Sequence, residues 1–231
     1  NMNKLRNMLI AAIAIAGLST SAFAGSFGIG VAGSLAVVEA EGIEKDKDGT
    51  ADTSTRTGEA SNNAFIGELF GEYSFDFMNG FTLGVAYIPG SADVSSKKVS
   101  RTDSGTAEVP VRNVDNITRT ANAEVSKHLT YYAAIPVGGA GLYGKVGMVT
   151  MDVTSTEVNA AGGGYGNTSA DGILYGLGFK ADLSESMYYK LEGTITEFDT
   201  ITINSTTSDK ANSISADLDV TKLTFAVGYA F

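Results

Sequence analysis

The segment Lys222–Phe231 alternates between two kinds of side chain along its whole length. Small or polar residues take the even-numbered positions, and apolar or aromatic residues take the others, at Leu223, Phe225, Val227, Tyr229 and Phe231. This period of two indicates a β-strand with one apolar face and one small, polar face. In a soluble sandwich a second sheet would have to cover the apolar face, whereas in a membrane barrel lipid covers it. The segment therefore favours a transmembrane barrel.

A secretory leader is predicted near the other end of the sequence. Lys4 and Arg6 form a short basic region, and an uncharged apolar run follows over Met8–Leu18. Ala22-Phe23-Ala24 then provides a small-x-small cleavage site. The apolar run is too short to span a bilayer and has the flanks of a signal peptide. We expect residues 1–24 to be removed and residues 25–231 to form the barrel.

Composition narrows the class of protein. The chain has 16 Lys and Arg against 26 Asp and Glu, so without Lys4 and Arg6 the net charge is 14 − 26 = −12. This acidic balance argues against a nucleic-acid partner, which would require a basic face. The sequence indicates no cofactor. The aspartates at Asp46, Asp48 and Asp52 resemble a calcium loop in their spacing. The glycine stands at the fourth position instead of the sixth, however, and Thr57 stands at the twelfth in place of a glutamate, so no metal site is predicted.

Eight alternating segments are predicted strands, at about 26–38, 63–76, 81–88, 120–135, 142–154, 171–181, 187–203 and 218–231. Short turns alternate with long polar connections at 39–62, 89–119, 155–170 and 204–217. This asymmetry predicts an all-β, up-and-down antiparallel transmembrane barrel of eight strands. A ten-stranded barrel, with a hairpin inside Ala92–Val114, is the alternative. Lys127 is the one charge that falls on the lipid-facing side of its segment, which predicts a β-bulge or a snorkelling ammonium group there.

The segments and the aromatic ending resemble the small outer membrane barrels of bacteria, a group that includes the outer membrane protein A transmembrane domain and the opacity-type proteins. The resemblance implies a location in the outer membrane, among lipids that include lipopolysaccharide. It also implies that Tyr229 and Phe231 form a C-terminal signal read by the barrel-assembly machinery. Extracellular ligands, if there are any, would bind the loops.

Charged residues also occur at positions that the alternation places inside the barrel. Eight strands leave an interior that side chains can fill, so these charges are expected to pair across it. The predicted network consists of Glu68, Glu72, Glu124, His128, Lys145, Lys180, Lys190, Glu192 and Lys222.

Three functions follow from such a network. A paired network would plug the barrel and leave a structural protein that presents its loops at the cell surface. Pairs that exchange would instead open a narrow passage for small solutes. A lipid-modifying hydrolase built on Glu124, Ser126 and His128 is the third option, but those residues are expected to face the lumen while lipid lies outside, so an enzyme is not predicted.

Overall fold

The computed structural model describes residues 25–47, 53–76, 80–93, 99–103, 117–121, 123–155, 165–206 and 213–231. The predicted leader, residues 1–24, lies outside the described residues, and its removal stays a prediction. Within the ranges just given, no helix has the length and apolarity needed to cross a membrane.

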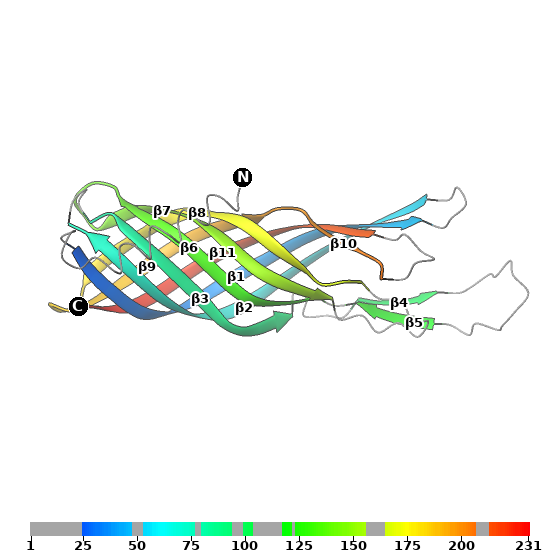
Figure 1. Ribbon diagram of the computed structural model, residues 1–231, viewed down its shortest axis with the longest axis horizontal. Coiled ribbons are helices and arrows are strands. Elements are labelled where there is room, and N and C mark those ends of the chain that lie inside the picture. The colour runs from blue at the N-terminus through cyan, green and yellow to red at the C-terminus, as the bar shows by residue number, and fades with distance from the viewer. Residues whose placement is uncertain are drawn as a thin grey trace, which may run out of the picture.

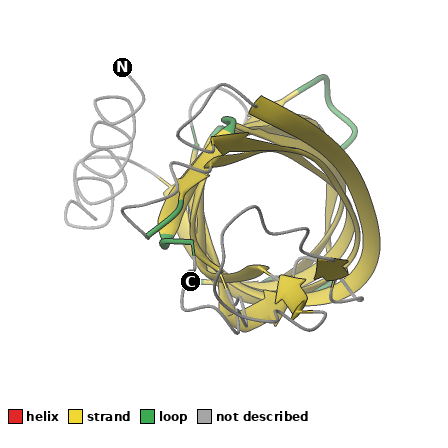
Figure 2. Cartoon of the chain, turned by 90° about the vertical axis from the view of Figure 1, so that its right-hand side faces the viewer, coloured by secondary structure: helices red, strands yellow, loops and turns green. Residues whose placement is uncertain are grey.

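Antiparallel strands surround a single axis (Figures 1 and 2). The N-terminal strand pairs with the C-terminal strand from Gly28–Ala230 to Lys45–Ser213, which closes the sheet into a barrel. This confirms the predicted all-β, up-and-down fold. The strands of the circuit are β1 (Gly25–Lys47), β2 (Thr53–Phe75), β3 (Thr82–Asp93), β6 (Ala123–Pro136), β7 (Leu142–Ser155), β8 (Thr168–Asp182), β9 (Met187–Phe198) and β11 (Ser213–Ala230).

Three further short strands lie outside the circuit. β10 (Ile201–Asn204) follows β9 in the chain and pairs with the first residues of β11. β4 (Val99–Asp103) and β5 (Ile117–Ala121) pair only with each other and form a separate two-stranded sheet. The ten-stranded alternative is therefore wrong, because its extra hairpin does not enter the barrel wall. This hairpin projects from the end of the barrel that carries the long connections, here called the loop end (Figure 1).

The outer surface of the barrel carries an apolar belt. On β1 the outward side chains Phe27, Ile29, Val31, Leu35 and Val37 are all exposed. Comparable exposed apolar residues on the other strands include Phe65, Leu69, Val146, Ile173, Leu177, Leu191, Leu223 and Phe225. A membrane-spanning strand needs about 9–11 residues. The belt on β1 has this length, so it can face the hydrocarbon of a bilayer.

The strands β1 and β2 continue far beyond this belt. Both have 23 residues, and the predicted loop 39–62 is wrong over most of its length, since β1 runs to Lys47 and β2 begins at Thr53. The reason is an inversion of polarity. Above Val37 the outward residues Glu39 and Glu41 are exposed carboxylates, whereas the inward Val38 and Ala40 pack in the barrel interior. With carboxylates on the outer side, these parts of the strands have the composition of a polar loop and lack the outward apolar residues of a lipid-facing strand.

An apolar cluster lies in the barrel interior toward the loop end. It is contributed by β7, β8, β9, β10 and β11, with partly buried residues of β1 and β6 packed against it. Its buried members are Val149, Met151, Val153, Ala170, Leu174, Phe198, Ile201 and Leu218. This part of the barrel therefore has an apolar inside and a charged outside, as a soluble barrel has, while the belt region has the opposite arrangement.

A β-bulge interrupts β6 where the sequence predicted an irregularity. Lys127 has a positive φ of 51°, and the pairing of β6 with β7 shifts between Ser126 and Leu129. The Lys127 ammonium group lies 2.9 Å from the Asp152 carboxylate, and its side chain is 77% exposed. The predicted bulge is confirmed. Because one extra residue enters the strand, the inward and outward positions exchange on its two sides.

Candidate functional site

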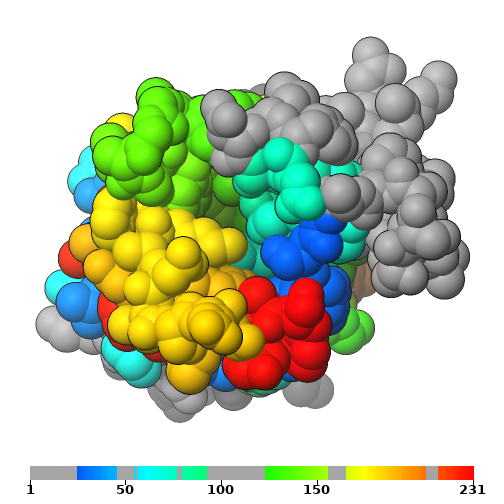
Figure 3. Space-filling model, turned by 90° about the vertical axis from the view of Figure 1, so that its left-hand side faces the viewer, coloured from blue at the N-terminus to red at the C-terminus, as the bar shows by residue number. Residues whose placement is uncertain are grey.

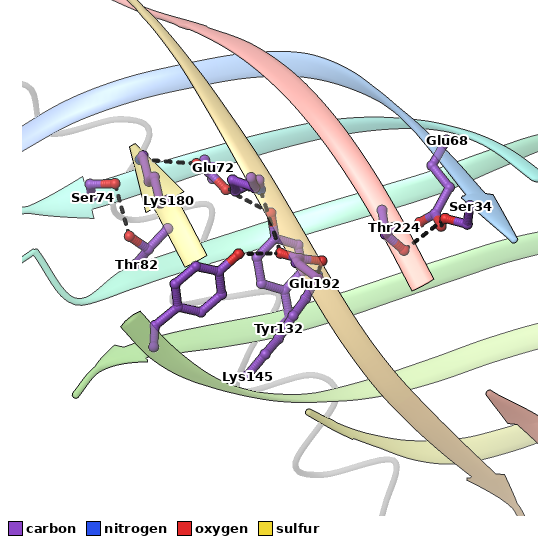
Figure 4. A network of polar contacts seen from close by, with 12 residues as sticks. Ser34, Glu68, Glu72, Ser74, Thr82, Tyr132, Lys145, Lys180, Glu192 and Thr224 are labelled. Carbon is purple, nitrogen blue, oxygen red and sulfur yellow. Dashed lines mark hydrogen bonds and ion pairs between the residues drawn. The ribbon is translucent and has the colours of Figure 1, made fainter. Parts of the chain in front are cut away.

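The buried carboxylate of Glu72 on β2 is the centre of a polar network that crosses the barrel interior (Figure 4). Lys190 on β9 donates to it at 2.8 Å, and the Tyr132 hydroxyl on β6 donates at 2.9 Å. Lys180 on β8 donates at 3.3 Å and is the more exposed of the two lysines. Three strands are thus tied to one carboxylate. Removing Glu72 would leave two ammonium groups and a hydroxyl without their acceptor.

Glu192 on β9 is a second centre beside the first. It accepts hydrogen bonds at 2.6 Å from the Tyr143 hydroxyl and at 2.6 Å from the Lys145 ammonium group. Lys190 lies 3.9 Å from the same carboxylate, so it links the two centres. Its ammonium group also lies 3.9 Å from the centroid of the Phe70 ring. Charges held in this way by carboxylates and aromatic faces are satisfied without bulk water.

Each of three interior tyrosines lies against a glycine on the neighbouring strand. Tyr132 is directly opposite Gly84, Tyr143 is opposite Gly178, and Tyr188 is opposite Gly228 in the strand register. A Cβ atom added to any of these glycines would overlap the facing tyrosine ring. The glycines therefore make room for the rings to lie across the wall, which holds the Tyr132 and Tyr143 hydroxyls at the two carboxylates.

A second, smaller polar group lies elsewhere on the inner wall. Lys222 on β11 donates to Glu68 on β2 at 2.5 Å, and Ser34 on β1 donates to the same carboxylate at 2.9 Å. The Ser34 and Thr224 hydroxyls are 2.8 Å apart. All four side chains are buried. This group ties β1, β2 and β11 together across the closure of the barrel.

Of the residues expected in the network, Glu124 is not in the lumen. Val125 lies opposite Val153, and both pack in the apolar cluster, so their neighbour Glu124 is on the outer side of the wall. The cause is the bulge at Lys127, which reverses the alternation that a regular strand would have. Glu68, Glu72, Lys145, Lys180, Lys190, Glu192 and Lys222 are all inside and joined by the contacts above.

His128 follows the bulge and faces inward. Its imidazole is near Lys222 and Glu68, and its Nδ1 atom is buried without a hydrogen-bond partner among the described residues. Ser126 precedes the bulge and lies opposite Asp152, on the outer side of the wall. Ser126 and His128 therefore point to opposite sides. The arrangement that a Ser/His/acid hydrolase needs is not assembled here.

A cavity of about 710 Å³ opens at the end of the barrel with the short turns. Figure 3 shows this end, with the β6–β7 turn in green, the β8–β9 turn in yellow and the C-terminal strand in red. The cavity is lined by Ser74, Thr82, Lys180 and the glycine-rich turn after Pro136, and it reaches Glu72, Lys190 and Glu192. The network therefore forms the inner end of a vestibule.

The two residues of the expected C-terminal signal lie on the outer surface at the same end. Tyr229 and Phe231 are both exposed, and their rings are in edge contact with centroids 5.0 Å apart. The Phe231 amide donates to the Phe27 carbonyl at 2.8 Å, and the two phenylalanine rings are 6.3 Å apart. Both residues are thus accessible from outside the barrel.

A closed antiparallel barrel with an apolar belt outside and ionised side chains inside defines an integral membrane β-barrel. The chain belongs to the outer membrane protein beta-barrel domain family, whose model matches residues 10–231. It is therefore located in the bacterial outer membrane, as the sequence predicted. No match is found among curated proteins by sequence.

Several solved outer membrane proteins are similar to this chain. OprG from Pseudomonas aeruginosa is 19% identical, with a TM-score of 0.44, covering 90% of this chain and 97% of its own. OmpT, the outer membrane protease of Escherichia coli, is 10% identical, with a TM-score of 0.49, covering 92% and 99%. Ail, the attachment invasion locus protein of Yersinia pestis, was solved with the heparin analogue sucrose octasulfate; it is 14% identical, with a TM-score of 0.39, covering 86% and 99%. At these identities the likeness concerns the fold alone.

Proposed function

We propose that this protein is a non-conducting barrel that anchors an extended extracellular sheet in the outer membrane and presents it at the cell surface. One observation carries the proposal: β1 and β2 have 23 residues each, although about 9–11 residues span a bilayer. At about 3.3 Å per residue, the surplus gives roughly 40 Å of each strand along its own axis beyond the belt. A barrel that served only as a pore would have no need of this extension.

The interior of the barrel supports the absence of conduction. The network of Glu72, Lys190 and Glu192 has every charge paired, and the apolar cluster follows toward the loop end. An ion that passed the first layer would then meet a layer lined mainly by apolar side chains, which cannot replace its hydration shell. Two successive layers of opposite chemistry are a stronger barrier than the charge network alone.

A narrow passage for small solutes is the second candidate, and the vestibule is the observation that favours it. The 710 Å³ cavity brings solvent from the periplasmic end to Lys180, whose side chain is 31% exposed and whose 3.3 Å contact with Glu72 is the longest in that group. If Lys180 and Lys190 released Glu72 in turn, the polar path would lengthen inward. The apolar cluster would still have to open.

Conductance of single molecules in planar bilayers tests the two candidates. The proposal expects no steps from protein that circular dichroism shows to be folded, for the wild type and for Val149→Ser, which adds one hydroxyl to the apolar cluster. Steps that change size in Glu72→Gln would support the passage and reject the non-conducting barrel. Lys127→Gln is the matched control, because Lys127 lies on the outer surface.

The assignments to lipopolysaccharide and to the assembly machinery belong to the same proposal. Exposed Tyr229 and Phe231 are available to the machinery during insertion. Lipopolysaccharide would surround the outer half of the apolar belt. Extracellular ligands would meet the strands and loops beyond it, and no enzymatic activity is proposed.

A further inference from the structure

The wall of the barrel is not paired along its whole height. β2 pairs with β3 only from Ser74–Thr82 to Leu69–Tyr87. Beyond Leu69, β2 continues to Thr53 with β1 on one side, while β3 continues to Asp93 beside β6. Among the described residues, no strand pairs with the other side of β2 from Thr53 to Glu68. This leaves a strand edge roughly 50 Å long, most of it beyond the apolar belt.

This edge has few of the features that protect natural edges from strand addition. It contains no proline and no lysine between Thr53 and Glu68, its charged residues are Arg56, Glu59 and Glu68, and most of the others are Thr, Ser, Asn, Ala or Gly. Short edge strands, prolines and lysines are the usual protection against pairing with another chain. The register of β2 is fixed by the ladder to β1, so the free backbone groups are held in the spacing that an incoming strand requires.

The sheet behind this edge carries rows of carboxylates on its outer face. Glu59 on β2 lies directly opposite Glu41 on β1, which lies directly opposite Asp217 on β11. In the next row Glu39 lies opposite Asp219, which lies opposite Glu197. None of these six carboxylates forms an ion pair with a basic side chain that the structure describes.

Like charges directly opposite each other on neighbouring strands repel, and an opposite charge on the next strand is favourable. The strand position next to β2 is the one place where a basic side chain would stand opposite Glu59 in the same row. The charge of these two rows therefore favours a basic partner at the edge beside them.

A second copy of this chain does not fit this edge. Two barrels in one membrane stand the same way up, so a two-fold axis along the membrane normal would bring their β2 strands together in the same direction and not antiparallel. It would also place Glu59 of each copy near the acidic rows of the other. An extended segment of a separate polypeptide has neither restriction.

We propose that the β2 edge from Thr53 to Ser61, the part beyond the apolar belt, binds an extended basic polypeptide segment from outside the cell by strand addition. This names the partner for the surface presentation proposed above and rests on it. Backbone hydrogen bonds to the edge would supply most of the affinity. Lys or Arg at alternate positions of the partner would face Glu59 and the row behind it, which sets the preference for a basic sequence.

Amide hydrogen exchange on protein purified from outer membranes and placed in phospholipid nanodiscs tests the proposal. The probe is a synthetic peptide of alternating Lys and Thr, long enough to span Thr53–Ser61. A peptide of alternating Lys and Pro carries the same charge but cannot donate the alternate backbone hydrogen bonds. We expect alternate amides between Thr53 and Ser61 to exchange freely at first and to be slowed tenfold or more by the Lys-Thr peptide only.

Charge variants test the choice of partner. Glu59→Gln should weaken the affinity for the Lys-Thr peptide by up to about fivefold, the size of one cross-strand charge pair. Glu185→Gln makes the same change at the exposed β8–β9 turn on the far end of the barrel and should leave affinity unchanged. Equal effects of both variants would overturn the role of the carboxylate rows.

Two further results would overturn strand addition. Equal binding of both peptides without new amide protection would mean attraction by charge alone. Edge amides that are already protected in the free protein would mean that another part of the chain, or a second copy, covers the edge. A conducting barrel that still gained protection at β2 would reject the non-conducting proposal and leave this site standing, so the two failures are distinguishable.

Discussion

Replacement of Glu72 by Gln is the most direct test of whether the lumen is a closed polar core. The side chains of Glu72 and Lys190 are only 3% and 5% exposed, and they are 2.8 Å apart. Removing one partner of a buried ion pair costs about 3–5 kcal/mol, because the other charge stays buried without compensation. The introduced amide would keep one acceptor oxygen, and Lys190 would keep Glu192 at 3.9 Å. We therefore expect Glu72→Gln to lower the free energy of unfolding by about 3 kcal/mol, near the lower end of this range.

A double-mutant cycle makes the prediction specific to the pair. Lys190→Met alone should also destabilise the barrel. The double variant should lose less free energy of unfolding than the two single variants lose together, with a coupling energy of about 1–3 kcal/mol. Lys127→Met is the control, since the Lys127–Asp152 pair is on the surface, and it should add to Glu72→Gln within about 0.5 kcal/mol.

Urea titration of protein refolded in phospholipid vesicles, followed by far-ultraviolet circular dichroism, measures these values. The chain contains no tryptophan, so tryptophan fluorescence does not serve. A loss below about 1 kcal/mol for Glu72→Gln, with no coupling to Lys190→Met, would refute the reasoning. It would mean that water, and not Glu72, compensates the lysines, and that the interior is wet enough to reconsider a passage.

Three further predictions concern the wall and its assembly. Gly84→Ala should destabilise the barrel by about 1–3 kcal/mol in the same urea titration, because a methyl group would meet the Tyr132 ring. Gly67→Ala on the open outer face is the control and should change stability by less than about 0.5 kcal/mol. Lys127→Gly should leave the free energy of unfolding unchanged within about 1 kcal/mol, because relief of the positive φ offsets the lost surface ion pair. Lys127→Ile should lower it by more than about 1 kcal/mol. Equal stability of the two variants would argue against a strained bulge. Phe231→Ala should slow insertion into the outer membrane of cells, but the variant should fold at the wild-type rate in vesicles without assembly machinery. An equal delay in both would mean that Phe231 acts by stabilising the barrel through its contacts with Phe27, and not as a signal.

Side-chain alternation predicted the strands of the belt region well. Period two in the segments around Phe81–Ile88 and Lys222–Phe231 reports directly on which face meets lipid, and the structure has strands at both. The strand extensions from Glu39 to Lys47 and from Thr53 to Asn62 were missed because the environment outside the wall changes from lipid to water there. The pattern then has carboxylates outside, which is also the composition of a loop.

The interior could be predicted only in part. Positions such as Glu72 and Lys190 follow from alternation, because no irregularity separates them from the regular part of their strands. The position of Glu124 does not follow, because the extra residue at Lys127 exchanges inward and outward positions between the two sides of the bulge. The sequence predicted the bulge, but it did not predict that Glu124, which precedes it, would face outward. The pairing of Tyr132 with Gly84 depends on the register between strands, which no single segment encodes.

The ladder between β1 and β11 constrains the order in which the barrel can form. Gly28 pairs with Ala230, a separation of 230 − 28 = 202 residues, so the two strands that close the wall are almost the full chain apart. Loop closure over such a distance is slow, and contacts of this kind form late in folding. The hairpins can form as local units, but Glu68 and Lys222 cannot meet until β11 arrives. Every earlier state therefore has two open strand edges and a half-satisfied interior, which is the state a chaperone in the periplasm would have to protect.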